Sequence, residues 1–212
     1  AENRALLEDV KGIRQELQKR EDALLELEKD LTARSAALES RSARVEELED
    51  LLSSRDKAAK ALRNSLERAL LGFDGSGLTV EHRDGKVYVS LDAELLFASG
   101  SAVVDIRGKE LLISLGSVIS EQEDLEIIIE GHTDSDKLES PSFPHNNWEL
   151  SVLRATSVLE IISSQPGVDP SVLTASGRGE FHAVDPEDKS RNRRIEIILA
   201  PKLDALFDLL ED

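Results

Sequence analysis

The residues best suited to chemistry in this sequence are Asp134, at the end of Gly131-His132-Thr133-Asp134, and Arg154 further along the chain. A carboxylate accepts hydrogen bonds from an ammonium group, and a planar guanidinium donates two parallel hydrogen bonds to a carboxylate. Asp134 and Arg154 are therefore suited to a ligand that carries both an ammonium and a carboxylate group.

Metal binding and hydrolysis are the alternative chemistries. His132, Asp134, Asp136 and His145 offer mixed nitrogen and oxygen ligands, but their spacing matches no helix-based or finger-type metal site. Ser, His and Asp all occur, yet no Gly-x-Ser-x-Gly sequence presents a serine nucleophile. The sequence therefore predicts no metal site, no cofactor and no catalysis.

The elements that position these residues are strands that alternate with helices. Asp84-Gly85 suits a tight turn between strands at 78–82 and 86–91, and three consecutive isoleucines predict a buried strand at 125–130. Two further strands fit residues 173–176 and 194–199. Because polar residues follow the buried strand directly, Thr133 and Asp134 are expected at the mouth of a site rather than in the core.

Two helices complete the predicted domain. The first covers residues 105–119 with Ile106 on its buried side, and the second covers 147–164 with Trp148 expected in the core. From residue 86 onward the order is βαβαββ, which predicts an α+β protein whose globular part is an α/β sandwich of two helices against one sheet.

A heptad pattern precedes the globular part and runs without a slip from Leu6 to Ala69. One set of positions, seven residues apart, is apolar throughout: Val10, Leu17, Leu24, Leu31, Leu38, Val45, Leu52, Ala59 and Leu66. The alternating set is mixed, with apolar Leu6, Ile13, Leu27, Leu48, Leu62 and Ala69 but also Arg20, Arg34, Arg41 and Arg55. This period predicts a long α-helical coiled coil.

Arginine side chains reach solvent from a two-stranded seam more easily than from a broader core, so a homodimer is favoured over larger bundles. A single solvated helix is the alternative.

The composition limits the partners. The net charge of −17 opposes binding of nucleic acid, and the absence of cysteine excludes disulfides and thiolate metal sites within these residues. No apolar run is long enough to span a membrane, so any membrane attachment is expected from a segment upstream of Ala1.

Four motifs in order resemble those of the OmpA-like peptidoglycan-binding domain. They are Gly131-His132-Thr133-Asp134, then Asn147-Trp148-Glu149-Leu150-Ser151 with Arg154-Ala155, then Gly177-Arg178-Gly179-Glu180, and finally Asn192-Arg193-Arg194-Ile195-Glu196. The stretch Phe97–Ala102 is similar to the corresponding loop of flagellar stator B subunits, and the overall pattern resembles OmpA-family proteins of Bacteroidota.

The resemblance implies an OmpA-like sandwich that binds the diaminopimelate residue of peptidoglycan. Asp134 would meet the ammonium group and Arg154 the carboxylate, with Thr133, Asn147, Leu150 and Arg193 lining the same pocket. The protein would then be a non-catalytic tether in the periplasm, anchored to the outer membrane as a lipoprotein. The alternatives are the periplasmic part of a stator B-type motor subunit, and a coiled-coil scaffold that recruits a protein.

Two features depart from the family pattern. The loop from Ser135 to Asn146 is long and contains two prolines, and Ala98 stands where many relatives have an aspartate. Arg193 and Arg194 also have a structural alternative, in which one of them pairs with Glu130 or Glu196.

The expected division of the chain is a coiled coil at 1–71, a linker and hairpin start at 72–85, the peptidoglycan-binding domain at 86–200 and an amphipathic helix at 201–212.

Overall fold

The computed structural model describes residues 2–73, 77–122, 124–138 and 143–202. Contacts divide the chain into two units, one up to Leu52 and one from Ser53 onward. Each unit is described below by itself. The predicted C-terminal helix at 201–212 lies almost wholly outside the described residues.

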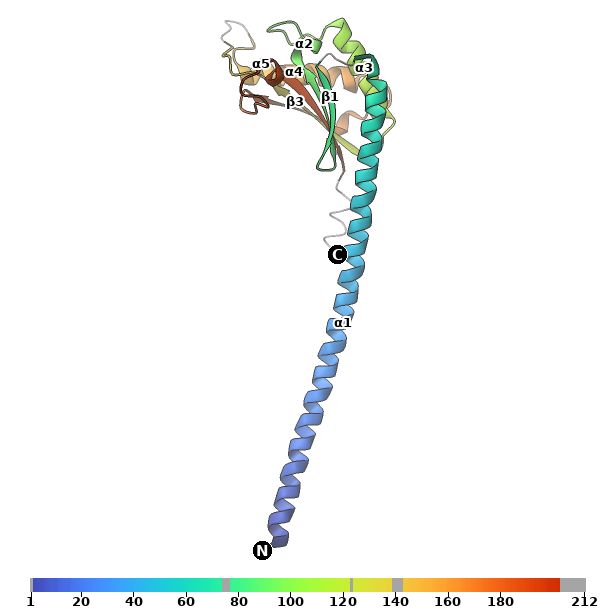
Figure 1. Cartoon of the computed structure of the whole chain (residues 1–212), viewed down its shortest axis with the longest axis vertical. Coiled ribbons are helices and arrows are strands. Elements are labelled where there is room, and N and C mark those ends of the chain that lie inside the picture. Colours follow the sequence, from blue (N-terminus) through green and yellow to red (C-terminus); the bar gives the residue numbers. More distant parts are fainter. Residues whose placement is uncertain (1, 74–76, 123, 139–142, 203–212) are drawn as a thin grey trace. The chain divides into compact units, whose positions relative to one another are not determined.

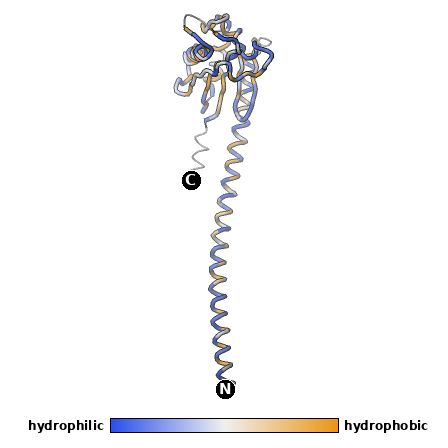
Figure 2. The backbone as a smooth tube through the Cα atoms, turned by 90° about the vertical axis from the view of Figure 1, so that its left-hand side faces the viewer, coloured by the Kyte–Doolittle hydropathy of each residue, from blue (hydrophilic) through white to orange (hydrophobic). Residues whose placement is uncertain are grey.

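Helix α1 (Glu2–Ala69) confirms the predicted long helix. Hydrophobic and hydrophilic residues alternate along the helix in this first unit, as the colours of the tube in Figure 2 show, and most of its large apolar side chains are exposed. The exposed apolar residues of this unit include Leu6, Val10, Ile13, Leu17, Leu24, Leu27, Leu31, Leu38, Val45 and Leu52. A second helix that covers this stripe, and hence the coiled coil, stays a prediction.

The last turns of α1 belong to the core of the second unit. Ala59, Leu62 and Leu66 are buried in the same cluster as the apolar residues of the sheet, and Leu70 follows them. The Nε atom of Arg63 donates a hydrogen bond to the carbonyl oxygen of Val80, 3.4 Å away. The contact boundary between Leu52 and Ser53 therefore lies well before the expected boundary at residue 71.

The second unit is built on a five-stranded sheet (Figure 1). Its strands are β1 (Leu78–Arg83), β2 (Lys86–Asp92), β3 (Leu125–His132), β4 (Leu173–Gly179) and β5 (Arg194–Pro201). The order across the sheet is β1-β2-β5-β3-β4. Strands β3 and β4 are parallel, and the other neighbours are antiparallel. The α+β class and the hairpin at Asp84-Gly85 are thus confirmed.

Helices α3 and α4 cover one face of this sheet. The helical elements after α1 are η1 (Leu71–Phe73), α2 (Ala93–Leu96), α3 (Ile106–Ser120), α4 (Asn147–Ser163), η2 (Pro170–Val172) and α5 (Lys189–Asn192). The side chain of Asp105 caps α3 by accepting from Gly108 N, and that of Asn146 caps α4 by accepting from Glu149 N. These caps fix where each helix begins.

The two faces of the sheet differ because side chains alternate along each strand. Ile127 and Ile129 of β3 are buried in the core with residues of α3 and α4. Ile128 and Glu130, which alternate with these two residues along β3, point to the opposite face. On β5, Glu196 points to that face as well, because its neighbours Ile195 and Ile197 are in the core. We call this opposite side the outer face.

Two expectations for individual side chains were wrong. Ile106, the first residue of α3, is 79% exposed, because the helix starts with this position turned away from the sheet. Trp148 is 51% exposed and stacks on Phe181, with ring centroids 5.3 Å apart, instead of entering the core.

The burial of α1 in the second unit predicts that two leucines with the same heptad position have different effects. Leu66→Ala removes a fully buried side chain and should lower the free energy of unfolding of the globular unit by about 2–5 kcal/mol. Leu38→Ala, in the exposed stripe, should leave that transition unchanged. Urea unfolding followed by the fluorescence of Trp148, the sole tryptophan, measures this difference. Equal shifts in both variants would contradict the assignment of Leu66 to the domain core.

Candidate functional site

Helix α4 lies very close to the ends of strands β3 and β4. A Cβ atom on Gly131 would overlap the carbonyl oxygen of Ser151, and one on Gly177 would overlap the Ser151 hydroxyl and the backbone of Val152. The two glycines therefore allow an approach that larger residues would block. This contact brings the first turns of α4 beside the residues that follow β3.

Ser151 joins the three elements at this contact. Its side chain is fully buried, its hydroxyl donates to the carbonyl oxygen of Trp148 at 2.9 Å, and it accepts from Gly179 N at 3.2 Å. The backbone N–H of Thr133 donates to the carbonyl oxygen of Gly179 at 2.9 Å. The chain leaving β3 is thereby held next to the end of β4.

Asp134 is buried and paired with a residue from the other end of the domain. Nη1 of Arg193 donates to Oδ2 of Asp134 at 2.8 Å, while the backbone N–H of Asp136 donates to Oδ1 at 3.0 Å. Nη2 of Arg193 binds Oε1 of Glu94 at 2.6 Å. Hydrogen bonds to Asp134 and then Glu94 raise the pKa of Arg193, which therefore stays charged.

Arg154 is 4% exposed and lies against the loop after α2. Its Nε donates to the carbonyl oxygen of Ser101 at 2.9 Å, and its guanidinium carbon lies 5.1 Å from the ring centroid of Phe97. Burial lowers the pKa of Arg154 and nearby Arg193 lowers it further, whereas Asp134 raises it. The two charged groups of the predicted site are thus close enough to act on each other.

Asn147 closes the site on the side of α4. Its buried amide nitrogen donates to the carbonyl oxygen of Asp136 and to Oε2 of Glu180, each at 2.9 Å. Thr133 is also buried, and its hydroxyl has no hydrogen-bond partner among the described residues. Buried polar groups normally have a hydrogen-bond partner, so this hydroxyl is an exception among the residues around the site.

The predicted site residues come from separate elements that surround the end of β3. Thr133 and Asp134 follow β3, Arg193 precedes β5, and α4 contributes its residues from its first three turns. Asp134 accepts hydrogen bonds from the side chains of Arg193 and Asn147. Its charge also raises the pKa of Arg154. Leu150, in the same part of α4, is buried.

The structure also separates the roles of the two consecutive arginines. Arg193 reaches Asp134, whereas Arg194 is 4% exposed and donates through Nε to Oε1 of Glu196 at 2.6 Å. The structural alternative, in which one of the two arginines pairs with Glu130 or Glu196, is therefore confirmed for Arg194, which pairs with Glu196.

Sequence reasoning missed three residues at the site: Glu94, Ser101 and Glu180. Glu94 and Glu180 bind Arg193 and Asn147 through their side chains, and Ser101 binds Arg154 through its backbone. Glu180 was visible as the last residue of the Gly177-Arg178-Gly179-Glu180 motif. A backbone carbonyl leaves no signal in side-chain chemistry, so Ser101 was not predictable from residue type.

Residues 96–196 match the OmpA family. The motility protein B of Bacillus subtilis is 29% identical over 163 residues, which are 74% of this chain and 58% of that protein. The probable lipoprotein YiaD of Escherichia coli is 30% identical over 132 residues, 60% of this chain and 57% of that protein. The chain thus spans less than two thirds of the length of these relatives.

Two solved structures are similar over nearly their whole length. A putative MotB-like protein from Desulfovibrio vulgaris has a TM-score of 0.65 and 25% identity, and covers 72% of this chain and 99% of its own. The cell wall anchor of the T6SS from Pseudomonas aeruginosa has a TM-score of 0.58 and 27% identity, and covers 65% and 97%. The resemblance to the OmpA-like fold is confirmed, and the likeness to Bacteroidota proteins stays a prediction.

The close contact of α4 with β3 gives a test that needs no ligand. Gly131→Ala should destabilise the globular unit by about 1–3 kcal/mol, because the added methyl group meets helix backbone that cannot rotate away. Gly72→Ala is the matched control, since a Cβ there meets nothing within 4 Å. Thermal unfolding of both variants measures the effect, and a native-like transition in Gly131→Ala would show that α4 lies further from the sheet.

Proposed function

Because the chain carries an OmpA-family domain at residues 96–196, we propose that this domain binds peptidoglycan non-covalently and performs no catalysis. The observation that carries the proposal is that an acidic side chain, Asp134, and a basic one, Arg154, are both buried among the residues around the end of β3. A group with an ammonium and a carboxylate on one carbon matches that pair, and the diaminopimelate of the stem peptide has such a group.

The hydrogen bonds of the two residues leave room for this ligand. An ionised carboxylate has about four acceptor sites, and Arg193 and the N–H of Asp136 use two of those on Asp134. Nε of Arg154 is used by Ser101, and its terminal nitrogens have no hydrogen bond to the described residues. The ammonium would therefore join Arg193 at Asp134, and the carboxylate would bind the terminal nitrogens of Arg154.

The remaining predicted residues take supporting roles in this proposal. Thr133 offers its unpaired hydroxyl, Asn147 holds the Asp136 and Glu180 side of the pocket, and Leu150 supplies an apolar wall. Arg193 holds Asp134 in place through a hydrogen bond while it is itself held by Glu94.

The wider role proposed is a tether in the periplasm that holds the envelope to the wall, with anchoring to the outer membrane as part of the proposal. The lipoprotein among the relatives fits this role. The motility protein B and the MotB-like structure fit the alternative, the periplasmic part of a stator B-type subunit. Within the described residues, no helix has both the length and the apolar character needed to cross a membrane. The coding sequence ahead of Ala1 separates the two roles, through a lipobox cysteine or a membrane helix with an acidic residue.

Wall binding predicts that the native chain pellets with purified peptidoglycan sacculi. Asp134→Asn and Arg154→Gln each remove a charge-assisted contact of about 1.5–3 kcal/mol, so each should weaken binding by at least about tenfold. The measurement is the bound fraction after centrifugation at increasing sacculus concentration.

Two substitutions of the same chemistry serve as controls for sacculus binding. Asp84→Asn and Arg107→Gln change exposed residues outside the pocket and should pellet like the native chain. Free diaminopimelate should release the native protein, whereas cadaverine, which has two ammonium groups but no carboxylate, should release it poorly. If the native chain stays in solution, the scaffold alternative becomes the better explanation.

The exposed stripe on α1 leads to a second proposal, a homodimer through a coiled coil that doubles the attachment to a repeating polymer. Leu31→Asp places a charge in that seam and should convert the dimer to a monomer. Ala36→Asp, outside the heptad seam, should remain dimeric. Sedimentation equilibrium gives the mass, and a monomeric native chain would leave the stripe as the surface of a single helix.

A further inference from the structure

The outer face of the sheet carries two carboxylates directly opposite each other. Glu130 of β3 and Glu196 of β5 are register partners in the antiparallel pair, and Glu130 is 8% exposed. Like charges at directly opposed positions destabilise a sheet unless positive charge compensates them. The two carboxylates therefore need compensating positive charge or hydrogen-bond donors, and the neighbouring side chains satisfy only one oxygen of each.

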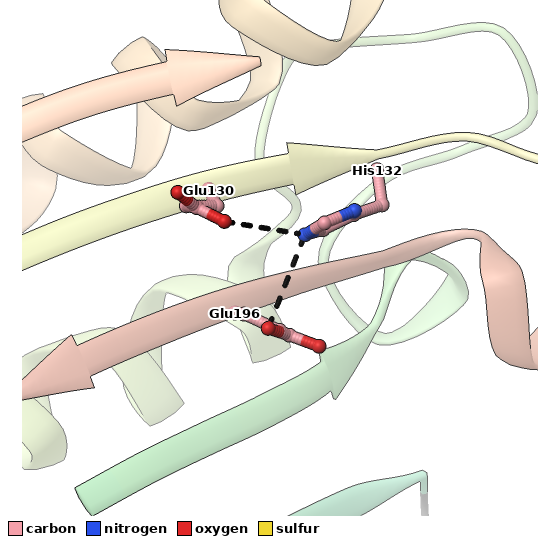
Figure 3. Close-up of side chains that lie close together, drawn as sticks. All are labelled: Glu130, His132 and Glu196. Atoms are coloured by element: carbon pink, nitrogen blue, oxygen red, sulfur yellow. Dashed lines mark ion pairs between the residues drawn. The ribbon is translucent and has the colours of Figure 1, made fainter. Parts of the chain in front are cut away.

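Two arginines take one oxygen of each carboxylate. Nη2 of Arg178 donates to Oε1 of Glu130, and Nε of Arg194 donates to Oε1 of Glu196, each at 2.6 Å. The second oxygens of both glutamates are directed at His132 instead (Figure 3). Nε2 of His132 lies 3.8 Å from Oε2 of Glu130 and 4.0 Å from Oε2 of Glu196, too far for hydrogen bonds.

His132 is the least satisfied polar side chain in this region. It is 3% exposed, and neither ring nitrogen has a hydrogen-bond partner among the described residues. A buried polar group without a partner is unfavourable, so this side chain calls for an explanation. A nitrogen ligand without a partner and two oxygen ligands without a partner thus converge on one point from two strands.

We propose that Glu130, His132 and Glu196 bind one divalent transition-metal ion of the Zn²⁺ class. Imidazole and carboxylate together suit such ions. The three ligand atoms lie within 4.8 Å of one another. Four-coordinate Zn²⁺ holds its ligands at about 2.0–2.2 Å, which sets neighbouring ligand atoms roughly 3.4 Å apart. The two nitrogen–oxygen separations need to shorten by about half an ångström, and the separation between the two carboxylate oxygens, which is within 4.8 Å, by at most about 1.4 Å.

The surroundings match those of a metal site. A ligating carboxylate is usually oriented by a second hydrogen bond, and Arg178 and Arg194 provide one for each glutamate. Burial, with a smaller contribution from Arg194, lowers the pKa of His132 to about 3.

Of the three ligands, Glu196 is the one that borders open space on the outer face. Glu196 lines a groove of about 240 Å³ on the outer face, together with residues of β1 and β2 such as Glu81 and Asp92. Water reaching the ion through this groove would complete a three-residue ligand set. The net charge of −17 raises the local concentration of cations at the surface.

This site differs from the metal cluster considered from the sequence alone, with which it shares only His132. It also does not depend on peptidoglycan binding, because its ligands face away from α4. The glutamates were not candidates in the sequence because Glu196 lies far from His132 along the chain, and only the β3–β5 register brings them together.

The test is equilibrium dialysis of the full chain against Zn²⁺ in chelator-free buffer, with metal and protein measured on both sides. We expect one ion per native chain, and at least tenfold weaker binding for His132→Gln and for Glu196→Gln. His145→Gln is the matched control, since His145 is an exposed histidine paired with Glu149 and should leave Zn²⁺ binding unchanged. Circular dichroism checks that each variant is folded.

A second readout uses the native protein alone, so that a misfolded variant does not decide the outcome. Histidine ring signals in an NMR titration with Zn²⁺ should show saturable changes at His132 at one equivalent. The proposal is overturned if the native chain binds no ion, if His132→Gln binds as tightly as the native chain, or if only the His145 signals change, which would indicate adventitious surface binding.

Discussion

The contact between α4 and the ends of β3 and β4 is the constraint on which the candidate site depends. Gly131 and Gly177 have no side chain to separate the helix from the sheet, and Ser151 fills the remaining space with a buried hydroxyl that bonds both elements. Arg154 follows Ser151 by about one helical turn. Its position relative to Asp134 is therefore set by backbone packing, which is more rigid than a contact between two long side chains.

Two charged pairs with different surroundings lie at and beyond the end of β3. Asp134, beyond the strand, pairs with Arg193 beside α4, whereas Glu130 pairs with Arg178 on the outer face. Buried charges are tolerated when they are paired and hydrogen-bonded. Arg193 and Arg194 are consecutive in the chain, and their side chains point to opposite sides. Arg193 binds Asp134 beside α4, and Arg194 binds Glu196 on the outer face.

The sequence predicted the elements well because periodicity and turn chemistry are local signals. The hairpin at Asp84-Gly85 and the limits of α3 and α4 follow from such signals. The site residues came from motif resemblance, and the structure places Asp134, Arg193 and Asn147 in direct contact. What the sequence did not give depends on tertiary packing. Trp148 stacks on Phe181 because a loop distant in sequence offers a ring at the surface, and Glu94 reaches Arg193 from a four-residue helix.

The heptad pattern of α1 shows most clearly how one periodic signal can serve two kinds of burial. An apolar residue every seven positions predicts a covered stripe but does not identify what covers it. For Ala59, Leu62 and Leu66 the cover is the core of the chain's own domain. A side chain already buried there is not available to a second helix. Any seam with another copy is therefore confined to the heptads before Ala59, where the apolar side chains are exposed and the arginines Arg20, Arg34 and Arg41 have access to solvent.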